Sequence, residues 1–151
     1  VGTIVVVFFA DSFLTPFTAF LTTLGVVIAA WGGVMLADIA LRRKDYDEPS
    51  LFTPSGRYGS VNWGAVASLI VGSLVGWGLV VNASASWLSW QGYLLGPLGG
   101  REGDWAGANI GILLAMVVGF VGYWATSAGR VRAQEKLPSR TYAEGADEGE
   151  Q

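Results

Sequence analysis

The sequence predicts an all-α integral membrane protein, and the main reason is where its charges lie. Three long stretches, 12–37, 58–100 and 105–129, contain no Asp, Glu, Lys or Arg. A helix needs about 20 apolar residues to cross the hydrocarbon core of a bilayer. A lipid-exposed backbone must also satisfy its own hydrogen bonds, which leaves helices or closed barrels. The stretches lack the alternating ten-residue segments of a barrel, so we expect helices.

Composition supports this class and excludes others. Hydrophobic residues make up 52% of the chain and charged residues 14%, against about 25% charged in soluble proteins. The chain has no Cys and no His, so it lacks a thiol nucleophile and the commonest general base and metal ligand. We therefore expect no enzyme, no catalytic residues and no metal site. Basic residues interleaved with aromatics are also absent, so we expect no nucleic-acid partner.

Residues 1–10 (VGTIVVVFFA) are apolar but too few to span a membrane. They lack the basic leader and the small-residue cleavage site of a signal peptide. We interpret them as the end of a truncated transmembrane helix, followed by a polar link at Asp11 and Ser12. This interpretation makes the chain the C-terminal part of a larger protein. The alternative is a complete small membrane protein with a short re-entrant N-terminus.

Six further elements follow along the chain. They are a transmembrane helix at 13–41, a polar loop at 42–61, a second transmembrane helix at 62–81, an external interfacial segment at 82–107, a third transmembrane helix at 108–127 and a disordered tail at 128–151. The interfacial segment is apolar for a loop, and we expect it to contain a short helix. The tail becomes polar and then acidic, a composition typical of disorder.

Lys and Arg predict the orientation. The loop at 42–61 holds four of them, the segment at 82–107 holds one, and the tail holds four. Cytoplasmic loops of membrane proteins are enriched in Lys and Arg. We therefore expect a multi-pass protein of the cell (plasma or inner) membrane, with the first loop and the C-terminus in the cytoplasm.

Each predicted transmembrane helix carries a row of small residues four apart. Such residues share a helix face, and small side chains there let membrane helices approach closely. The pattern predicts a packed bundle rather than a single anchor. The three rows are Gly25, Ala29, Gly33 and Ala37; Gly64, Ser68, Gly72 and Gly76; and Gly107, Gly111, Ala115 and Gly119.

Few polar side chains lie inside the predicted spans. Asp38 is the ionisable residue among them, and it precedes Arg42 by four residues, a spacing that forms ion pairs on helices. It fits either an ion pair at the cytoplasmic edge or part of a cytoplasmic gate or proton path. Thr15, Thr18 and Thr22 share one face. They either bond to carbonyls of their own helix or form a wet wall that faces a substrate.

Several motifs resemble one family of transporters. The tenth helix of nucleobase:cation symporter family 1 is similar to Phe20–Leu24 (FLTTL), Gly32–Asp38 (GGVMLAD) and Leu41–Arg43 (LRR). The segment Leu51–Trp63 resembles the loop that follows in that family. The second span and the motifs between Trp90 and Gly111 look most like the purine–cytosine permease branch. The resemblance covers roughly residues 8–128.

The resemblance implies a twelve-helix transporter with inverted repeats (LeuT-like), in which substrate binds near the bilayer midplane at broken helices. This chain would supply the end of helix nine and helices ten to twelve. The remaining nine helices would hold the base-stacking aromatics and the sites of the coupling cation, H⁺ or Na⁺. The implied function is cation-coupled import of purine bases or cytosine, with no cofactor bound in this fragment.

The family's tenth helix also supplies a thin outer gate over the bound substrate. By resemblance Leu21 is the gate contact, with Phe20 and Thr22 beside it and Thr18 one turn earlier. Thr22 stands where relatives carry Asn, and Ile39 where they often carry an aromatic or His. A hydroxyl offers a base fewer donors and acceptors than an amide. A transporter for hydantoin, allantoin or a vitamin therefore stays open, as does an accessory structural membrane subunit.

Overall fold

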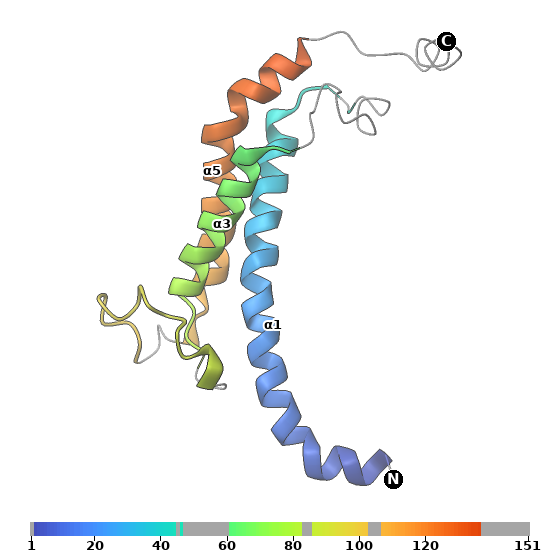
Figure 1. Ribbon diagram of the computed structural model, residues 1–151, viewed down its shortest axis with the longest axis vertical. Helices are drawn as coiled ribbons and strands as arrows, with labels where there is room; N and C mark the ends of the chain where they lie inside the picture. Colours follow the sequence, from blue (N-terminus) through green and yellow to red (C-terminus); the bar gives the residue numbers. More distant parts are fainter. Residues whose placement is uncertain (1, 45, 47–60, 83–85, 103–106, 137–151) are drawn as a thin grey trace.

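The computed structural model contains three long helices and one short helical turn. It describes residues 2–44, 46, 61–82, 86–102 and 107–136, with side chains from residue 13 onward. Its elements are α1 (Gly2–Leu41), α3 (Trp63–Gly78), the 3-10 turn η1 (Ser86–Leu88) and α5 (Ile110–Glu135). Within these residues no strand occurs, which confirms the all-α prediction. Figure 1 shows α3 running beside α1 and α5 in the opposite direction.

Helix α1 is longer than the sequence predicts. Two helices, at 1–10 and 13–41, are expected, but a single helix continues through Asp11 and Ser12. Asp and Ser cost at most about 0.7 kcal/mol each inside a helix relative to Ala, which is too little to end one. Figure 1 shows α1 bending in its N-terminal part. Pro16 lies within this helix, and proline bends helices because it lacks an N–H and crowds the carbonyl four residues earlier.

Helix α3 ends three residues before the predicted end of its span. Asn62 caps its N-terminus, because the side-chain oxygen accepts hydrogen bonds from the N–H groups of Gly64 (3.1 Å) and Ala65 (3.4 Å). Its 16 residues rise roughly 24 Å, less than the ~30 Å hydrocarbon core of a bilayer. Among the described helices, Phe13–Leu41 and Ile110–Glu135 are long and apolar enough to cross a membrane.

The predicted interfacial segment packs against α1 and α3. Its short helix is the single turn η1, and a run of turns over 93–99 follows. Leu88 is buried against Ala19 of α1. The ring of Trp90 meets Trp77 of α3 edge-on, with centroids 5.6 Å apart. Residues 83–85 and 103–106 of this segment lie outside the described part of the chain.

Helix α5 extends eight residues beyond its predicted end, into the stretch that the sequence assigns to a disordered tail. Val131 and Gln134 are buried on this extension and continue the buried face of Ser127. Arg130 and Arg132 are exposed and occupy other faces. A charged stretch continues as a helix when one of its faces still packs against protein. The tail beyond 136 and most of the loop at 42–61 lie outside the described residues.

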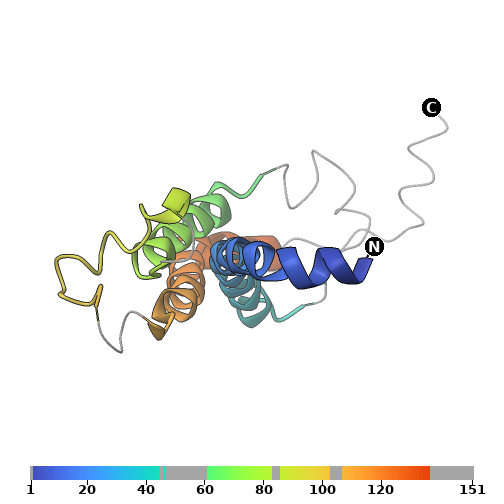
Figure 2. The same cartoon turned by 90° about the horizontal axis from the view of Figure 1, so that it is seen from below.

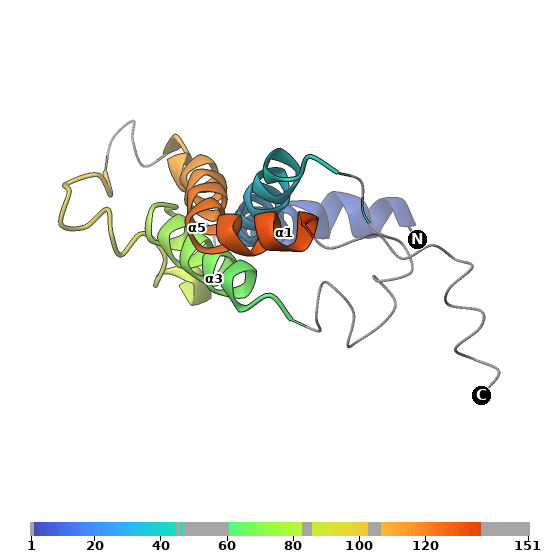
Figure 3. The same ribbon diagram turned by 90° about the horizontal axis from the view of Figure 1, so that it is seen from above.

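Helix α5 is the centre of the bundle. It packs against both α1 and α3, which touch each other less, and the views from the two ends show this arrangement (Figures 2 and 3). The contacts are between backbones. A Cβ atom added to Gly33 would lie 2.1 Å from the carbonyl oxygen of Met116, and one added to Gly119 would lie 2.4 Å from that of Ala30. The predicted small-residue packing is therefore present.

The contact row on α1 differs from the predicted row in its first half. A Cβ atom on Gly25 would have one neighbour, 4.0 Å away. Val26 and Ala30 are instead fully buried in the core with Ala115 of α5. A step of four residues overshoots a full helical turn by about 40°. A straight contact row must therefore include a step of three, which here runs from Ala30 to Gly33.

Large apolar side chains lie on the outside of the bundle. Ile28, Trp31 and Leu113 are each more than half exposed, whereas the helix contacts are made mainly by Gly, Ala and Ser. In water so much exposed apolar surface is unfavourable. Membrane helices show this arrangement because lipid solvates the large side chains while small residues bring the helices together. The outer surface therefore suits lipid or further protein segments.

Two neighbouring glycines test the backbone contact. Gly33→Ala places a methyl group against the Met116 carbonyl and should lower the free energy of unfolding by about 1–3 kcal/mol. Gly32→Ala is the matched control, because an added Cβ there has no neighbour within 4 Å and Ala is the better helix former. Thermal unfolding of the purified variants in detergent measures both. Equal effects of the two substitutions would contradict a close α1–α5 contact.

Candidate functional site

The predicted gate residues lie on the outer surface of α1. Phe20 and Leu21 are 48% and 47% exposed, and Thr18 is exposed as well. Thr22 is half-buried, and its hydroxyl donates a 3.0 Å hydrogen bond to the carbonyl of Thr18. Thr22 therefore bonds to its own helix, and its oxygen keeps its capacity to accept a further hydrogen bond.

Hydrogen bonds hold the opposite face of the same helical turn. We name the set of five residues that form them the outer clamp: Ala19, Thr23, Trp77, Asn82 and Gln91. The carbonyl of Ala19 accepts a 3.0 Å hydrogen bond from Asn82. The carbonyl of Thr23 accepts one of 3.0 Å from the indole of Trp77, and the Thr23 hydroxyl accepts one of 3.0 Å from Gln91. No charge or motif in the sequence indicates this role of Trp77.

Helical geometry places the gate and the outer clamp on opposite sides of α1. Successive residues are about 100° apart around a helix. Ala19 and Thr23 therefore lie close together, and Leu21 lies about 180° from the point midway between them. The outer clamp fixes this part of α1 from one side and leaves Leu21 exposed on the other.

Gln91 connects the outer clamp to the interfacial segment. Its side chain is 2% exposed, and within the described residues its Oε1 atom has no hydrogen-bond partner. The guanidinium of Arg101 donates to the backbone carbonyls of Gln91 (2.9 Å) and Gly92 (3.3 Å). Gly92 has a φ of +75°, a conformation that favours glycine. Arg101 thus holds the tight bend that presents Gln91 to α1.

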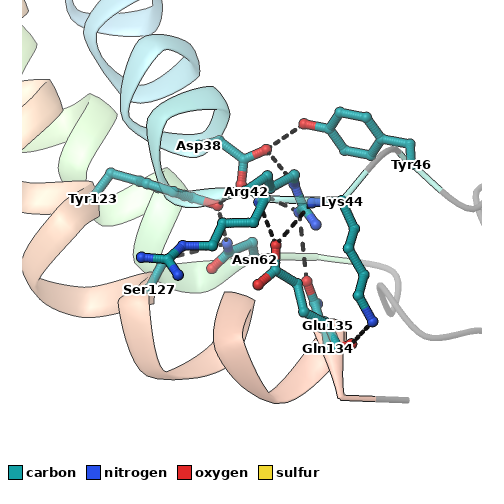
Figure 4. Close-up of polar contacts among 10 residues, drawn as sticks. Asp38, Arg42, Lys44, Tyr46, Asn62, Tyr123, Ser127, Gln134 and Glu135 are labelled. Atoms are coloured by element: carbon teal, nitrogen blue, oxygen red, sulfur yellow. Dashed lines mark hydrogen bonds and ion pairs between the residues drawn. The ribbon is translucent and has the colours of Figure 1, made fainter. Parts of the chain in front are cut away.

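A second polar site lies at the other end of the bundle. We name it the Asp38 cluster, and its members are Asp38, Arg42, Tyr46 and Tyr123 (Figure 4). Arg42 binds the Asp38 carboxylate through two hydrogen bonds, from Nε (2.8 Å) and Nη2 (3.2 Å). The hydroxyls of Tyr46 and Tyr123 donate to the same carboxylate. Asp38 and Arg42 therefore form an ion pair, and Tyr123 brings α5 into it.

Further contacts connect the Asp38 cluster to all three helices. The Nη2 atom of Arg42 lies 3.5 Å from Gln134 of α5. The side-chain amide of Asn62, which caps α3, lies 3.4 Å from the hydroxyl of Tyr123 and 3.5 Å from that of Ser127. Each of the three helices thus contributes to one hydrogen-bonded network.

The surroundings of the ion pair are partly dry. The side chains of Arg42 and Asp38 are 13% and 16% exposed, and the Arg42 guanidinium lies 4.5 Å from the centre of the Tyr46 ring. Burial and the hydrogen bond to Asp38 raise the pKa of Tyr46, so its phenol keeps the proton that it donates. A pocket of about 370 Å³ adjoins these groups. A partly buried charge is tolerated when it is paired and hydrogen-bonded in this way.

The sequence predicts the Asp38–Arg42 pair but none of its partners on other elements. Tyr123, Ser127 and Gln134 share the buried face of α5. Their spacing of four and seven residues is a signal that one face of the helix continues past Ser127. Because the predicted helix ends at Ser127, Gln134 falls in the predicted tail, and the spacing is not recognised as one helix face.

A double-mutant cycle tests the Asp38 cluster. Tyr123→Phe and Asp38→Asn should each lower the free energy of unfolding by about 1–3 kcal/mol, because each weakens a hydrogen bond to a charged group. Combined, they should lower it by less than the sum, with a coupling energy of about 1 kcal/mol. Denaturant unfolding in micelles measures the cycle.

The control for this cycle pairs Asp38→Asn with Tyr93→Phe. The Tyr93 hydroxyl donates to the backbone carbonyl of Leu74 and makes no contact with Asp38. These two effects should be additive. Additivity of Asp38→Asn with Tyr123→Phe as well would contradict the contact between α1 and α5 at this end.

Comparison with known proteins identifies the family. The family described as permease for cytosine/purines, uracil, thiamine, allantoin matches residues 2–96, which is more than half of the chain and includes α1 and α3. Comparisons with curated proteins and with solved structures gave no match. Together with the two long apolar helices, the family indicates a membrane protein. The chain belongs to the family of permeases for cytosine/purines, uracil, thiamine and allantoin.

Proposed function

We propose that this chain is part of a secondary transporter that imports purine bases or cytosine with a coupling cation, H⁺ or Na⁺. The observation that carries the proposal is the family match over residues 2–96, which spans all of α1 with its gate segment. The resemblance of the tenth-helix motifs to nucleobase:cation symporter family 1 supports the same function. Transporters of this kind bind substrate near the midplane, between repeats that rock around it.

In this proposal the exposed face of α1 closes over the substrate. Leu21 is the gate contact, with Phe20 beside it, because an aliphatic side chain excludes water from a bound base without holding it tightly. The Thr22 hydroxyl already donates its proton to the Thr18 carbonyl. It therefore accepts a hydrogen bond from an N–H group of the base and does not donate one. The outer clamp supports this turn of helix from behind.

The rest of the proposed transporter follows from the resemblance. Nine further helices complete the inverted-repeat (LeuT-like) fold, and they hold the cation sites and the aromatics that stack on the base. The exposed large apolar side chains of the bundle are the surface available to those helices and to lipid. The fragment itself binds no cofactor in this scheme.

We also propose an orientation for the bundle. The basic residues after α1 and those near the end of α5 lie at one end of the molecule, and Arg101 belongs to the segment at the other (Figure 1). Enrichment in Lys and Arg favours the cytoplasmic side. The end with the Asp38 cluster and the C-terminus therefore faces the cytoplasm, in a multi-pass protein of the cell membrane.

A related substrate is the second candidate. The family description includes uracil, thiamine and allantoin, and by resemblance Thr22 stands where relatives carry Asn. The hydroxyl suits a substrate that offers it one hydrogen-bond donor. Such a substrate does not need the donor and acceptor that an amide side chain would supply together. Competition of each compound against radiolabelled cytosine and purine uptake separates the candidates.

Uptake by gate variants of the full-length protein tests the proposal in a strain without its own base permeases. Leu21→Ala should weaken uptake by leaving a gap over the substrate, and Leu21→Trp should reduce it more by obstructing closure. Thr22→Val removes the hydroxyl at nearly constant shape and should cost about 1–3 kcal/mol of affinity.

The matched control is Leu36→Ala, because Leu36 is 51% exposed on the same helix but lies four turns away. It should transport normally at the same surface expression. Unchanged transport constants in all three gate variants would remove Leu21 and Thr22 from the site. Absence of uptake of every compound by the wild-type protein would contradict the proposed function.

A further inference from the structure

A basic groove lies between the end of α1 and the last turns of α5. Its volume is about 620 Å³, within the range of about 300–1,000 Å³ typical of small-ligand sites. Arg43 and Lys44 line it from the end of α1, and Arg132 and Lys136 from α5. The four basic residues belong to segments far apart in the sequence, so the helix packing is what brings them together.

Among the described residues, the positive charge of the groove is largely uncompensated. Glu135 is its acidic residue, and its carboxylate accepts hydrogen bonds from the backbone N–H groups of Arg43 and Lys44. The Lys44 ammonium donates to the Glu135 backbone carbonyl at 2.9 Å. Within the described residues, no carboxylate forms an ion pair with Arg43, Arg132 or Lys136. In the described part of the chain, four cations therefore share one carboxylate that is already bonded to the backbone.

The groove continues into an apolar surface on α5. Trp124 lines the basic groove and also a second hollow of about 430 Å³, together with Phe120 and Val121. The rings of Phe120 and Trp124 are stacked 5.7 Å apart. Val117 and Leu113 extend the same exposed apolar face toward the N-terminal end of α5. The basic groove therefore adjoins the exposed apolar face of α5, and Trp124 lies at the boundary between them.

We propose that this groove binds an anionic phospholipid. The phosphate lies among Arg43, Lys44, Arg132 and Lys136, because Lys and Arg pair strongly with phosphate oxygens. One acyl chain follows the apolar face of α5. Basic pockets beside transmembrane helices attract anionic head groups, and Trp is favoured where head groups meet chains. The apolar face favours a lipid over a free phosphate, and the excess of cations favours an anionic over a zwitterionic lipid.

Native mass spectrometry of the purified full-length protein in neutral detergent tests this site. Phosphatidylglycerol is the probe, and phosphatidylcholine and glycerol 3-phosphate are the comparisons. Phosphatidylglycerol should bind more tightly than either. Arg132→Gln with Lys136→Gln should weaken it about 25-fold, at roughly fivefold for each basic residue near the phosphate. Arg43→Gln alone should weaken it about fivefold and tests the site from α1 if the double variant does not fold.

Arg130→Gln is the matched control. It removes the same charge from the same helix, but Arg130 lines the pocket of the Asp38 cluster and not the basic groove. Its effect should stay within about twofold, because exposed charges outside the site are screened. An equal loss in Arg130→Gln and Arg43→Gln would show diffuse attraction and overturn the site. Equal affinity for phosphatidylcholine, or for glycerol 3-phosphate, would overturn it too.

This inference depends on membrane insertion and not on the transported compound. Lipid binding is measured without uptake, so its loss would leave the transport proposal standing. Conversely, a protein that binds the lipid at the groove but transports no base would retain this site and lose the proposed function.

Discussion

The backbone contact between α1 and α5 sets where the other contacts of the bundle form. Gly33 and Gly119 let the carbonyl oxygens of the opposite helix approach to distances that a side chain would block. In a membrane such close contact drives helix association, because lipid is as apolar as the side chains. With the helix axes fixed this close, Tyr123 reaches Asp38. The same approach places the basic ends of the two helices around one groove.

Polar contacts at the two ends of the bundle add to the helix packing that the small residues allow. The Asp38 cluster joins the three helices at one end, and the outer clamp holds one turn of α1 against α3 and the interfacial segment at the other. Buried polar groups that find partners in this way add specificity to a contact that is otherwise only van der Waals. These contacts leave α1 with one face held by the outer clamp and the opposite face exposed. Leu21 lies on the exposed face.

The sequence was sufficient for the helical class and for the local pair Asp38–Arg42, because apolar length and i,i+4 spacing are properties of one segment. It was not sufficient for partners on other elements, such as Tyr123 or Gln91, which depend on how helices pack. Two boundary errors have physical causes. Asp11 is polar but costs a helix little, and the polar end of α5 hides a buried face at Val131 and Gln134. The gate residues rest on family resemblance, since an exposed Leu has no signal of its own.

We propose that the bundle crosses a membrane with the Asp38 cluster on the cytoplasmic side, and accessibility to a label tests this orientation most directly. This chain has no cysteine, so each single substitution in it introduces one thiol at a known position. Ser89→Cys lies in the interfacial segment and Ala133→Cys near the end of α5, and both positions are exposed. In sealed cells, an impermeant maleimide should label position 89 at once and position 133 only after permeabilisation. Labelling of position 133 from outside, or of both positions from the same side, would contradict the account.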